Sequence, residues 1–279
     1  MSEFEIKKRT AFIKEKEFNY IYPFRLETKK ENIFSFPVPE YIQNRGEDDI
    51  NNYYRRLSWR QSSNNIEFMQ LKYSAGIEMR EIVDETKSML SRFEKHFSQD
   101  FPKEKLYLWE ADSYIYILWL LSLAVLSDSK DYLQIIPTWI GSEDESTDLP
   151  LVDKPMKAFL DLVDYQGQVQ VADKVFFPKS VYPLISEMID AETPKKGELL
   201  KQYLKGWYKS NKDTYWYNYH KENDGKLFFG YWSFESAVLA LLLNINVGIE
   251  EIDTISVFPK DYFYWAKLVC IARRKLGNK

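Results

Sequence analysis

The sequence predicts an all-α protein, with two helical subdomains packed into one compact, bundle-like body. Three observations support this fold class: apolar residues recur at helical spacing along most of the chain, the apolar run at 114–126 is typical of a buried helix, and strand-like alternation is scarce. With 279 residues, 45% of them hydrophobic, the chain can bury a sizeable core. We therefore expect an ordinary soluble globular protein.

The expected helices follow from the positions of the apolar residues. Residues 77–97 place one apolar face between charged positions, which predicts a long amphipathic helix. Residues 111–126 are apolar on all sides, so we expect this helix to be central and covered by others. Shorter apolar stripes predict helices at 156–163, 181–189, 200–207 and 234–245, and a last helix with Asp261 as its N-cap.

The loop at 141–155 is the best candidate for a division of the chain, because it lacks helical periodicity and is rich in turn-forming and acidic residues. This acidic loop would separate an N-terminal helical subdomain at 46–140 from a C-terminal one at 156–279. Residues 1–45 are expected to form an N-terminal extension or arm, with "FSFPVPEY" extended. The strand-like stretches "KVFFP" and "KLFFG" are short, and the second follows a turn signal.

Composition restricts the chemistry that the chain can perform. The one cysteine, Cys270, excludes an internal disulfide, and the two histidines, His96 and His220, leave little for a metal site. We therefore expect no metal and no cofactor. No secretory signal is visible, and the run at 114–126 is too short to span a bilayer, so the expected location is the cytoplasm.

The charge distribution points to the kind of partner. Residues 46–266 carry 24 Lys/Arg and 35 Asp/Glu, a net charge of −11. Because phosphate neutralisation drives nucleic-acid binding, an acidic body argues against direct binding of DNA or RNA. It favours a basic protein partner, although mild acidity is also common among soluble proteins.

Enzyme motifs are missing, but two candidate acids need an interpretation. "HKEND" gathers His220, Glu222 and Asp224 in a polar, turn-like stretch, which we interpret as a solvated loop. Glu235 stands alone among aromatic and aliphatic residues in "FFGYWSFESAVLALLLNI", near the start of a predicted helix. An ionised carboxylate buried alone is costly, so Glu235 needs a donor partner and is interpreted as a structural strut.

An alternative function stays open on these residues. A small helical enzyme could use Glu235, or the cluster of His220 and Glu222, as its acid or base. The substitution Glu235→Gln would abolish activity in an enzyme, whereas in a strut it would lower the melting temperature. A third interpretation, nucleic-acid binding through interleaved Lys and Tyr in 201–221, is opposed by the acidic body.

For a binding protein, two groups of residues are the candidate contacts. Acids in the loop would speed the approach of a basic partner, and a run of aromatic residues would supply affinity. The acidic candidates are Glu143, Asp144, Glu145 and Asp148, and the aromatic candidates are Tyr215, Trp216, Tyr217 and Tyr219.

Several motifs resemble those of the PoNi-type immunity proteins. "WYKSNKDTYWYNYHK", "FFGYWSFESAVLALL" and "FPKDYFYWAK" resemble the C-terminal half of that family, and "YYRRLSWRQSSNNIEFMQLKYSAGIEMREI" resembles its N-terminal helical segment. The resemblance covers about residues 46–270. The matching positions are Trp207, Tyr208, Gly230, Tyr231, Trp232, Phe234, Glu235, Pro259, Asp261, Tyr73, Ser74 and Gly76.

The resemblance implies both a fold and a function. It implies an all-α protein, not an enzyme, that binds and neutralises a polymorphic nuclease toxin of the PoNe type, from the PD-(D/E)xK superfamily. Such toxins are delivered between competing bacteria, and the toxin partner is expected to be encoded next to its immunity protein. The shared motif residues are largely apolar, so we expect them to hold the fold rather than to contact the toxin.

Overall fold

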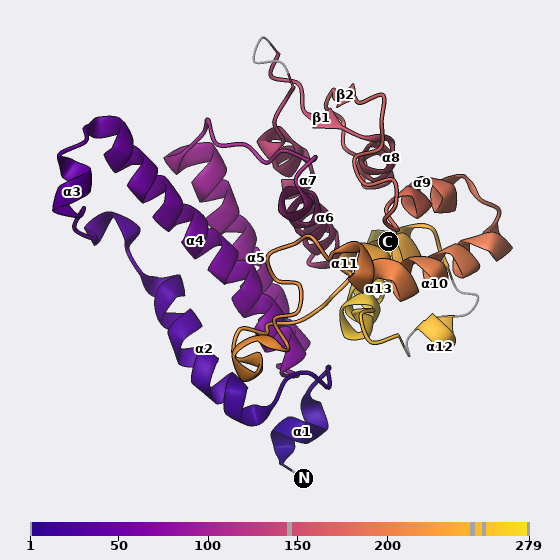
Figure 1. Cartoon of the computed structure of the whole chain (residues 1–279). Coiled ribbons are helices and arrows are strands. Elements are labelled where there is room, and N and C mark those ends of the chain that lie inside the picture. The colour runs from indigo at the N-terminus through magenta and orange to yellow at the C-terminus, as the bar shows by residue number, and fades with distance from the viewer. Residues whose placement is uncertain (1, 144–146, 246–248, 253–254, 278–279) are drawn as a thin grey trace. The chain divides into compact units, whose positions relative to one another are not determined.

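The computed structural model describes residues 2–143, 147–245, 249–252 and 255–277. The chain divides into two units: unit 1 comprises Met1–Glu104 and Asn218–Gly230, and unit 2 comprises Lys105–Tyr217 and Tyr231–Lys279. Both units are built from helices, which confirms the predicted all-α fold class (Figure 1). The predicted domain boundary at 141–155 stays a prediction.

The elements of each unit follow in chain order. Unit 1 contains α1 (Glu3–Lys7), α2 (Glu15–Lys30), η1 (Ile33–Ser35), α3 (Glu40–Gln43), α4 (Glu47–Ser74), α5 (Met79–Glu94), the π-helix η2 (Lys95–Asp100) and η4 (Glu222–Gly225). Unit 2 contains α6 (Ala111–Leu126), α7 (Tyr132–Ile135), η3 (Ile136–Trp139), β1 (Leu151–Val152), α8 (Lys154–Leu162), β2 (Gln170–Val171), α9 (Pro183–Asp190), α10 (Thr193–Ser210), α11 (Phe234–Leu242), α12 (Ile249–Ile252) and α13 (Lys260–Gly277).

Most of the predicted helices agree with these bounds to within three residues, but α10 begins seven residues before the predicted 200–207, and α2 and α4 were not predicted from periodicity. The apolar run at 111–126 is α6, and the helix expected at 77–97 is α5, which continues as a π-helix at its end. The expectation that Asp261 is an N-cap is wrong by two residues: α13 begins at Lys260, so Pro259 is at the N-cap position and Asp261 lies in the first turn, where its charge interacts favourably with the helix dipole. Within the described part of the chain, no helix is both long and apolar enough to cross a membrane.

Neither "KVFFP" nor "KLFFG" forms a strand. The described strands are β1 and β2, two residues each, which pair in parallel (Figure 1).

β1 belongs to a small backbone network that closes the loop 142–150 at its base. The N–H of Gly141 donates to the carbonyl of Leu106, and the N–H of Leu151 donates to the carbonyl of Gly141, both at 3.0 Å. The two ends of the acidic loop are therefore fixed to the rest of unit 2.

In unit 1, α2 and α5 pack against α4, whose C-terminal half is buried almost throughout. The amide of Gln61 on α4 donates to the carbonyls of Thr28, Lys29 and Glu31, at 3.2, 3.1 and 2.7 Å. The carbonyl of Thr28 also accepts from the N–H of Glu31 at 3.4 Å, so the Gln61 amide joins α4 to the C-terminal turn of α2. Residues 1–45 are thus mostly helical, and the extended backbone expected around 34–41 is confined to the link between η1 and α3.

The turn after α4 ties three segments of unit 1 together. The backbone N–H of Arg9 donates to the carbonyl of Ser74 at 2.8 Å, and its guanidinium donates to the carbonyl of Tyr73 at 2.8 Å. The buried hydroxyl of Ser74 donates to the carbonyl of Phe229 at 2.8 Å. Tyr73 and Ser74 therefore take part in contacts that join segments of unit 1.

In unit 2, α6 is central and packs against α7, η3, α11 and α13, which explains its apolar surface on all sides. Three indole rings stack in a row that begins on α6. The ring of Trp119 stacks on that of Trp216 at 5.6 Å between centroids, and Trp216 stacks on Trp207 at 5.8 Å. The indole N–H of Trp119 donates to the carbonyl of Trp232 at 3.0 Å. The motif tryptophans thus lie inside the unit.

The turn at Gly76 gives a test of this packing. Gly76 has φ +83°, and a Cβ there would stand 2.0 Å from the carbonyl oxygen of Lys7. We expect Gly76→Ala to lower the free energy of unfolding by more than the ~1–2 kcal/mol that left-handed backbone costs an alanine, because the backbone of Lys7 must also move. Gly225→Ala is the matched control, since Gly225 has φ +79° and the atom nearest to its Cβ position is the His220 carbonyl oxygen, at 3.4 Å. Equal losses in urea unfolding would contradict this packing.

Candidate functional site

Glu235 lies in the first turn of α11 and is fully buried. Its Oε1 accepts hydrogen bonds from the Tyr203 hydroxyl and the Ser233 hydroxyl, both at 2.8 Å, and from the Trp207 indole N–H. Burial raises the pKa of the Tyr203 hydroxyl well above its usual value, so this group stays protonated and can donate. Three donors from α10 and the start of α11 therefore converge on one carboxylate oxygen.

A second buried carboxylate, Asp153, caps α8 in the same unit. Its Oδ1 accepts from the N–H of Met156 at 3.1 Å and from the Tyr114 hydroxyl at 3.0 Å, and its Oδ2 accepts from the N–H of Phe176 at 3.0 Å. Asp153 belongs to the acidic segment 141–155 that the sequence predicts to be a loop, but it is an N-cap with no exposed surface.

The two carboxylates are connected through aromatic side chains. The ring of Tyr114 packs against that of Tyr182 at 4.6 Å between centroids, and the Tyr182 hydroxyl donates to Asn211 Oδ1 at 2.8 Å. The amide of Asn211 donates to the carbonyl of Trp207 at 2.8 Å, and Trp207 in turn donates to Glu235. This chain of contacts joins α6, α9, α10 and α11.

The surroundings of Glu235 favour a structural role. Burial raises its pKa, while the hydrogen bonds from Ser233, Tyr203 and Trp207 act in the opposite direction. Its Oε2 has no hydrogen-bond partner among the described residues, but neither oxygen is exposed to a substrate. We therefore keep the interpretation of Glu235 as a strut.

The cluster of His220, Glu222 and Asp224 lies in unit 1 at η4. Glu222 and Asp224 are exposed, and the ring of His220 packs against Phe12 at 4.8 Å between centroids. Burial and the neighbouring Lys221 lower the pKa of His220. Among the residues that the structure describes, no three or more His, Cys, Asp or Glu side chains are grouped to hold a metal ion.

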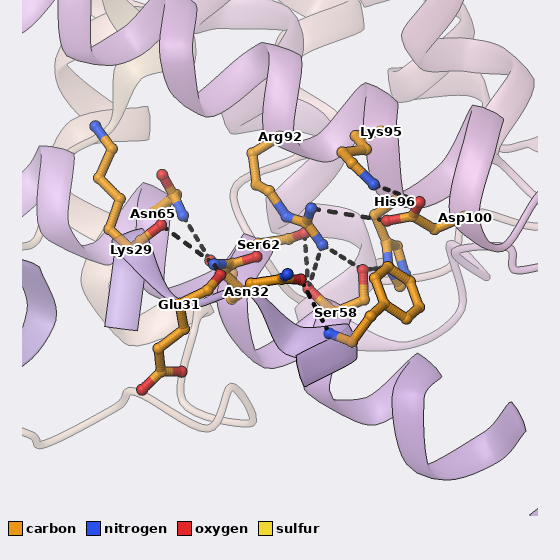
Figure 2. Close-up of polar contacts among 12 residues, drawn as sticks. Lys29, Glu31, Asn32, Ser58, Ser62, Asn65, Arg92, Lys95, His96 and Asp100 are labelled. Atoms are coloured by element: carbon orange, nitrogen blue, oxygen red, sulfur yellow. Dashed lines mark hydrogen bonds and ion pairs between the residues drawn. The ribbon is translucent and has the colours of Figure 1, made fainter. Parts of the chain in front are cut away.

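A buried polar cluster in unit 1, which sequence reasoning missed, surrounds the π-helix η2. Figure 2 shows the Arg92 guanidinium between Ser58 and Asp100, with His96 beside Ser58. His96 Nδ1 lies 2.9 Å from Ser58 Oγ, and burial, assisted by Arg92 and Arg55, lowers the pKa of His96 to about 3. Ser58 and His96 have no exposed surface, so this pair has no access to a substrate. The only sequence signal was a histidine on an apolar helix face.

The predicted partner contacts are dispersed. Of the acidic candidates, Glu143 and Asp148 are exposed in unit 2, while Asp144 and Glu145 lie outside the described residues. Trp216 is fully buried in the indole stack, so it does not lie on the surface as a partner contact would need to.

The three aromatic candidates beside Trp216 have some exposed surface. In unit 2, Tyr215 is exposed and Tyr217 is half-buried. In unit 1, Tyr219 is half-buried. The Tyr215 hydroxyl lies 2.7 Å from that of Tyr116, and its N–H donates to Asp112.

The stability of unit 2 should depend on the oxygen of Glu235. Glu235→Ala leaves three buried donors without their acceptor, at about 1–3 kcal/mol each, so we expect a loss of about 3 kcal/mol or more in urea unfolding at pH 7. Glu235→Gln keeps an acceptor oxygen and should cost less.

The raised pKa of Glu235 also predicts a pH dependence. Its contribution to stability is greatest below pH 4.5 and falls as the pH rises through the folded-state pKa. The difference in free energy of unfolding between the wild type and the Glu235→Gln variant should therefore shift in favour of the wild type as the pH falls. Glu187→Gln, at an exposed position on α9, is the control; a loss no larger than this control would contradict the strut.

The buried histidine predicts acid sensitivity. The pKa of His96 is lowered from 6.5 to about 3, so its contribution to stability is lost as the pH falls between these values. At ~1.4 kcal/mol per pKa unit, we expect the wild type to lose about 2–3 kcal/mol more than His96→Asn between pH 7 and pH 4.5. His220→Asn should reduce the acid sensitivity less than His96→Asn, because the pKa of His220 is also lowered but its ring is only half-buried. Parallel profiles for wild type and His96→Asn would contradict the burial of a neutral imidazole.

Comparison with known proteins identifies the family. The family model "PoNe immunity protein (PoNi), N-terminal" matches residues 9–136, which extends the match well before residue 46, and "PoNe immunity proteins (PoNi), C-terminal" matches residues 156–262. No curated protein matches the chain. The crystal structure of protein PA2201 from Pseudomonas aeruginosa is similar in fold, with a TM-score of 0.63 at 13% identity over 94% of this chain and 91% of that chain. Because the two family models together match most of the chain, it belongs to the PoNe immunity protein (PoNi) family.

Proposed function

We propose that this chain binds a cognate nuclease toxin of the PoNe type and neutralises it by forming a tight inhibitory complex. The observation that carries the proposal is the match to both PoNi family models, over residues 9–136 and 156–262. The toxin is proposed to be encoded beside this chain, and the complex to form in the cytoplasm of the producing cell. The chain itself performs no catalysis in this proposal.

The position of the candidate acids supports a binding role over an enzymatic one. Glu235 and Asp153 are fully buried and hold hydrogen-bond donors of their own unit. The exposed acids Glu143 and Asp148 belong to an acidic chain, which would attract a basic nuclease at long range. Asp144 and Glu145, with Tyr215, Tyr217 and Tyr219, stay proposed contacts that only variants can test.

An inhibition titration tests the proposal. The nuclease encoded next to this chain is assayed for DNA cleavage while the chain is added in increasing ratio. We expect cleavage to stop near a one-to-one ratio, because a tight complex is titrated stoichiometrically, and we expect the chain alone to leave DNA intact. A nuclease of an unrelated family is the control and should stay active. Undiminished cleavage, with no complex on gel filtration, would overturn the proposed pairing.

A further inference from the structure

Two aromatic side chains of unit 2, Tyr107 and Trp109, are exposed just before α6. The segment alternates: Leu106 and Leu108 are buried, whereas Tyr107 and Trp109 are 37% and 45% exposed. Alternation of this kind is typical of an extended segment with one face in the core. The two exposed rings lie on the same side and contact each other, with centroids 4.8 Å apart. They form an aromatic pair that faces solvent.

The aromatic pair is held rigidly against the base of the acidic loop. Tyr107 lies so close to Gly141 that a Cβ on the glycine would stand 2.4 Å from the ring. The backbone of Leu106 is fixed on both sides, since its N–H donates to Trp139 at 2.8 Å and its carbonyl accepts from Gly141 at 3.0 Å. Trp109 also contacts Phe176, edge to face, at 6.4 Å. Rigid aromatic side chains lose little entropy when a partner covers them, which suits them as binding anchors.

The segments that carry the aromatic pair and the loop are acidic. Residues 105–113 and 140–154 contain seven acids and two lysines, Lys105 and Lys154, and Asp153 among the acids is fully buried. Lys105 donates to the carbonyl of Thr138 at 2.6 Å. Among the acids, Glu110, Glu143 and Asp148 are exposed. A cationic surface would therefore be attracted to this patch, and an anionic one repelled.

We propose that Tyr107 and Trp109, flanked by Glu110, Glu143 and Asp148, form the surface of unit 2 that binds a Lys/Arg-rich protein surface, of the kind that a nuclease uses to hold DNA phosphates. This inference rests on the proposed function and names the part of the chain that contacts the toxin. Arg side chains of the partner can stack on the Trp109 and Tyr107 rings while the surrounding carboxylates pair with their charge. Sequence reasoning identified the acids of the loop but not the aromatic pair beside them.

The test measures binding of chain variants to the purified nuclease encoded beside this chain. We expect Trp109→Ala to raise Kd at least about 10-fold, in line with a central aromatic anchor, and Tyr107→Ala to raise it less. Tyr264→Ala is the matched control, because Tyr264 lies in the same unit and is 40% exposed, and we expect it to change Kd less than about 2-fold. The double charge reversal Glu143→Lys with Asp148→Lys should slow association and flatten its salt dependence, while the dissociation rate changes little.

The outcomes distinguish an error in this binding surface from an error in the proposed function. If the wild type binds and inhibits the nuclease, but the aromatic variants match Tyr264→Ala and the charge reversal leaves association unchanged, the surface is wrong and the proposed function stands. If the wild type neither binds nor inhibits, the proposed function falls and this inference falls with it. Should Trp109→Ala unfold, the charge-reversal variant decides, because both of its positions are exposed. Association rates equal to wild type would then overturn the proposal.

Discussion

Buried carboxylates must be surrounded by hydrogen-bond donors, and this requirement organises unit 2. Glu235 accepts from Tyr203, Ser233 and Trp207, and Asp153 accepts from Tyr114 and from backbone N–H groups at α8. Each donor comes from a helix or loop that must be in place before the carboxylate can be buried. Three of these donors, Tyr203, Trp207 and Tyr114, are aromatic side chains, and all three are themselves fully buried in the packing of unit 2.

This arrangement limits where the chain can act. The carboxylates with raised pKa values, which would be the first candidates for acid–base chemistry, are enclosed and already bound to protein donors. The same holds in unit 1 for Ser58 and His96, which resemble a nucleophile and its base but have no exposed surface. Chemistry that needs a substrate has no access to these groups, so the exposed faces of the units are where a partner can be recognised.

Much of this could be predicted from the sequence. Helical periodicity predicted the long helices α5, α6, α10 and α13, because burial of one face leaves a regular apolar pattern, and α6 agrees to the residue. It did not predict α2 or α4; the buried face of α4 carries polar residues such as Gln61 and Asn65, which hide the apolar pattern. The isolation of Glu235 in an apolar stretch likewise predicted a buried acid that needs donors. Trp216 and Asp153 were misjudged because their burial depends on partners distant in sequence, such as Trp119 and Tyr114. The exposed pair Tyr107 and Trp109 was missed because four residues of alternation, 106–109, are too few to stand out.

Hydrogen exchange of the chain, measured alone and with a saturating amount of its nuclease, tests the central claim most directly. We expect binding to slow exchange at backbone amides of 105–111, 141–143 and 147–152, beside the aromatic pair and at the two ends of the acidic loop. Amides of α10 and α11 around Glu235 should already exchange slowly in the free chain and change little. Protection confined to other segments, or fast exchange around Glu235 in the free chain, would contradict a rigid, carboxylate-held unit that recognises its partner at this surface.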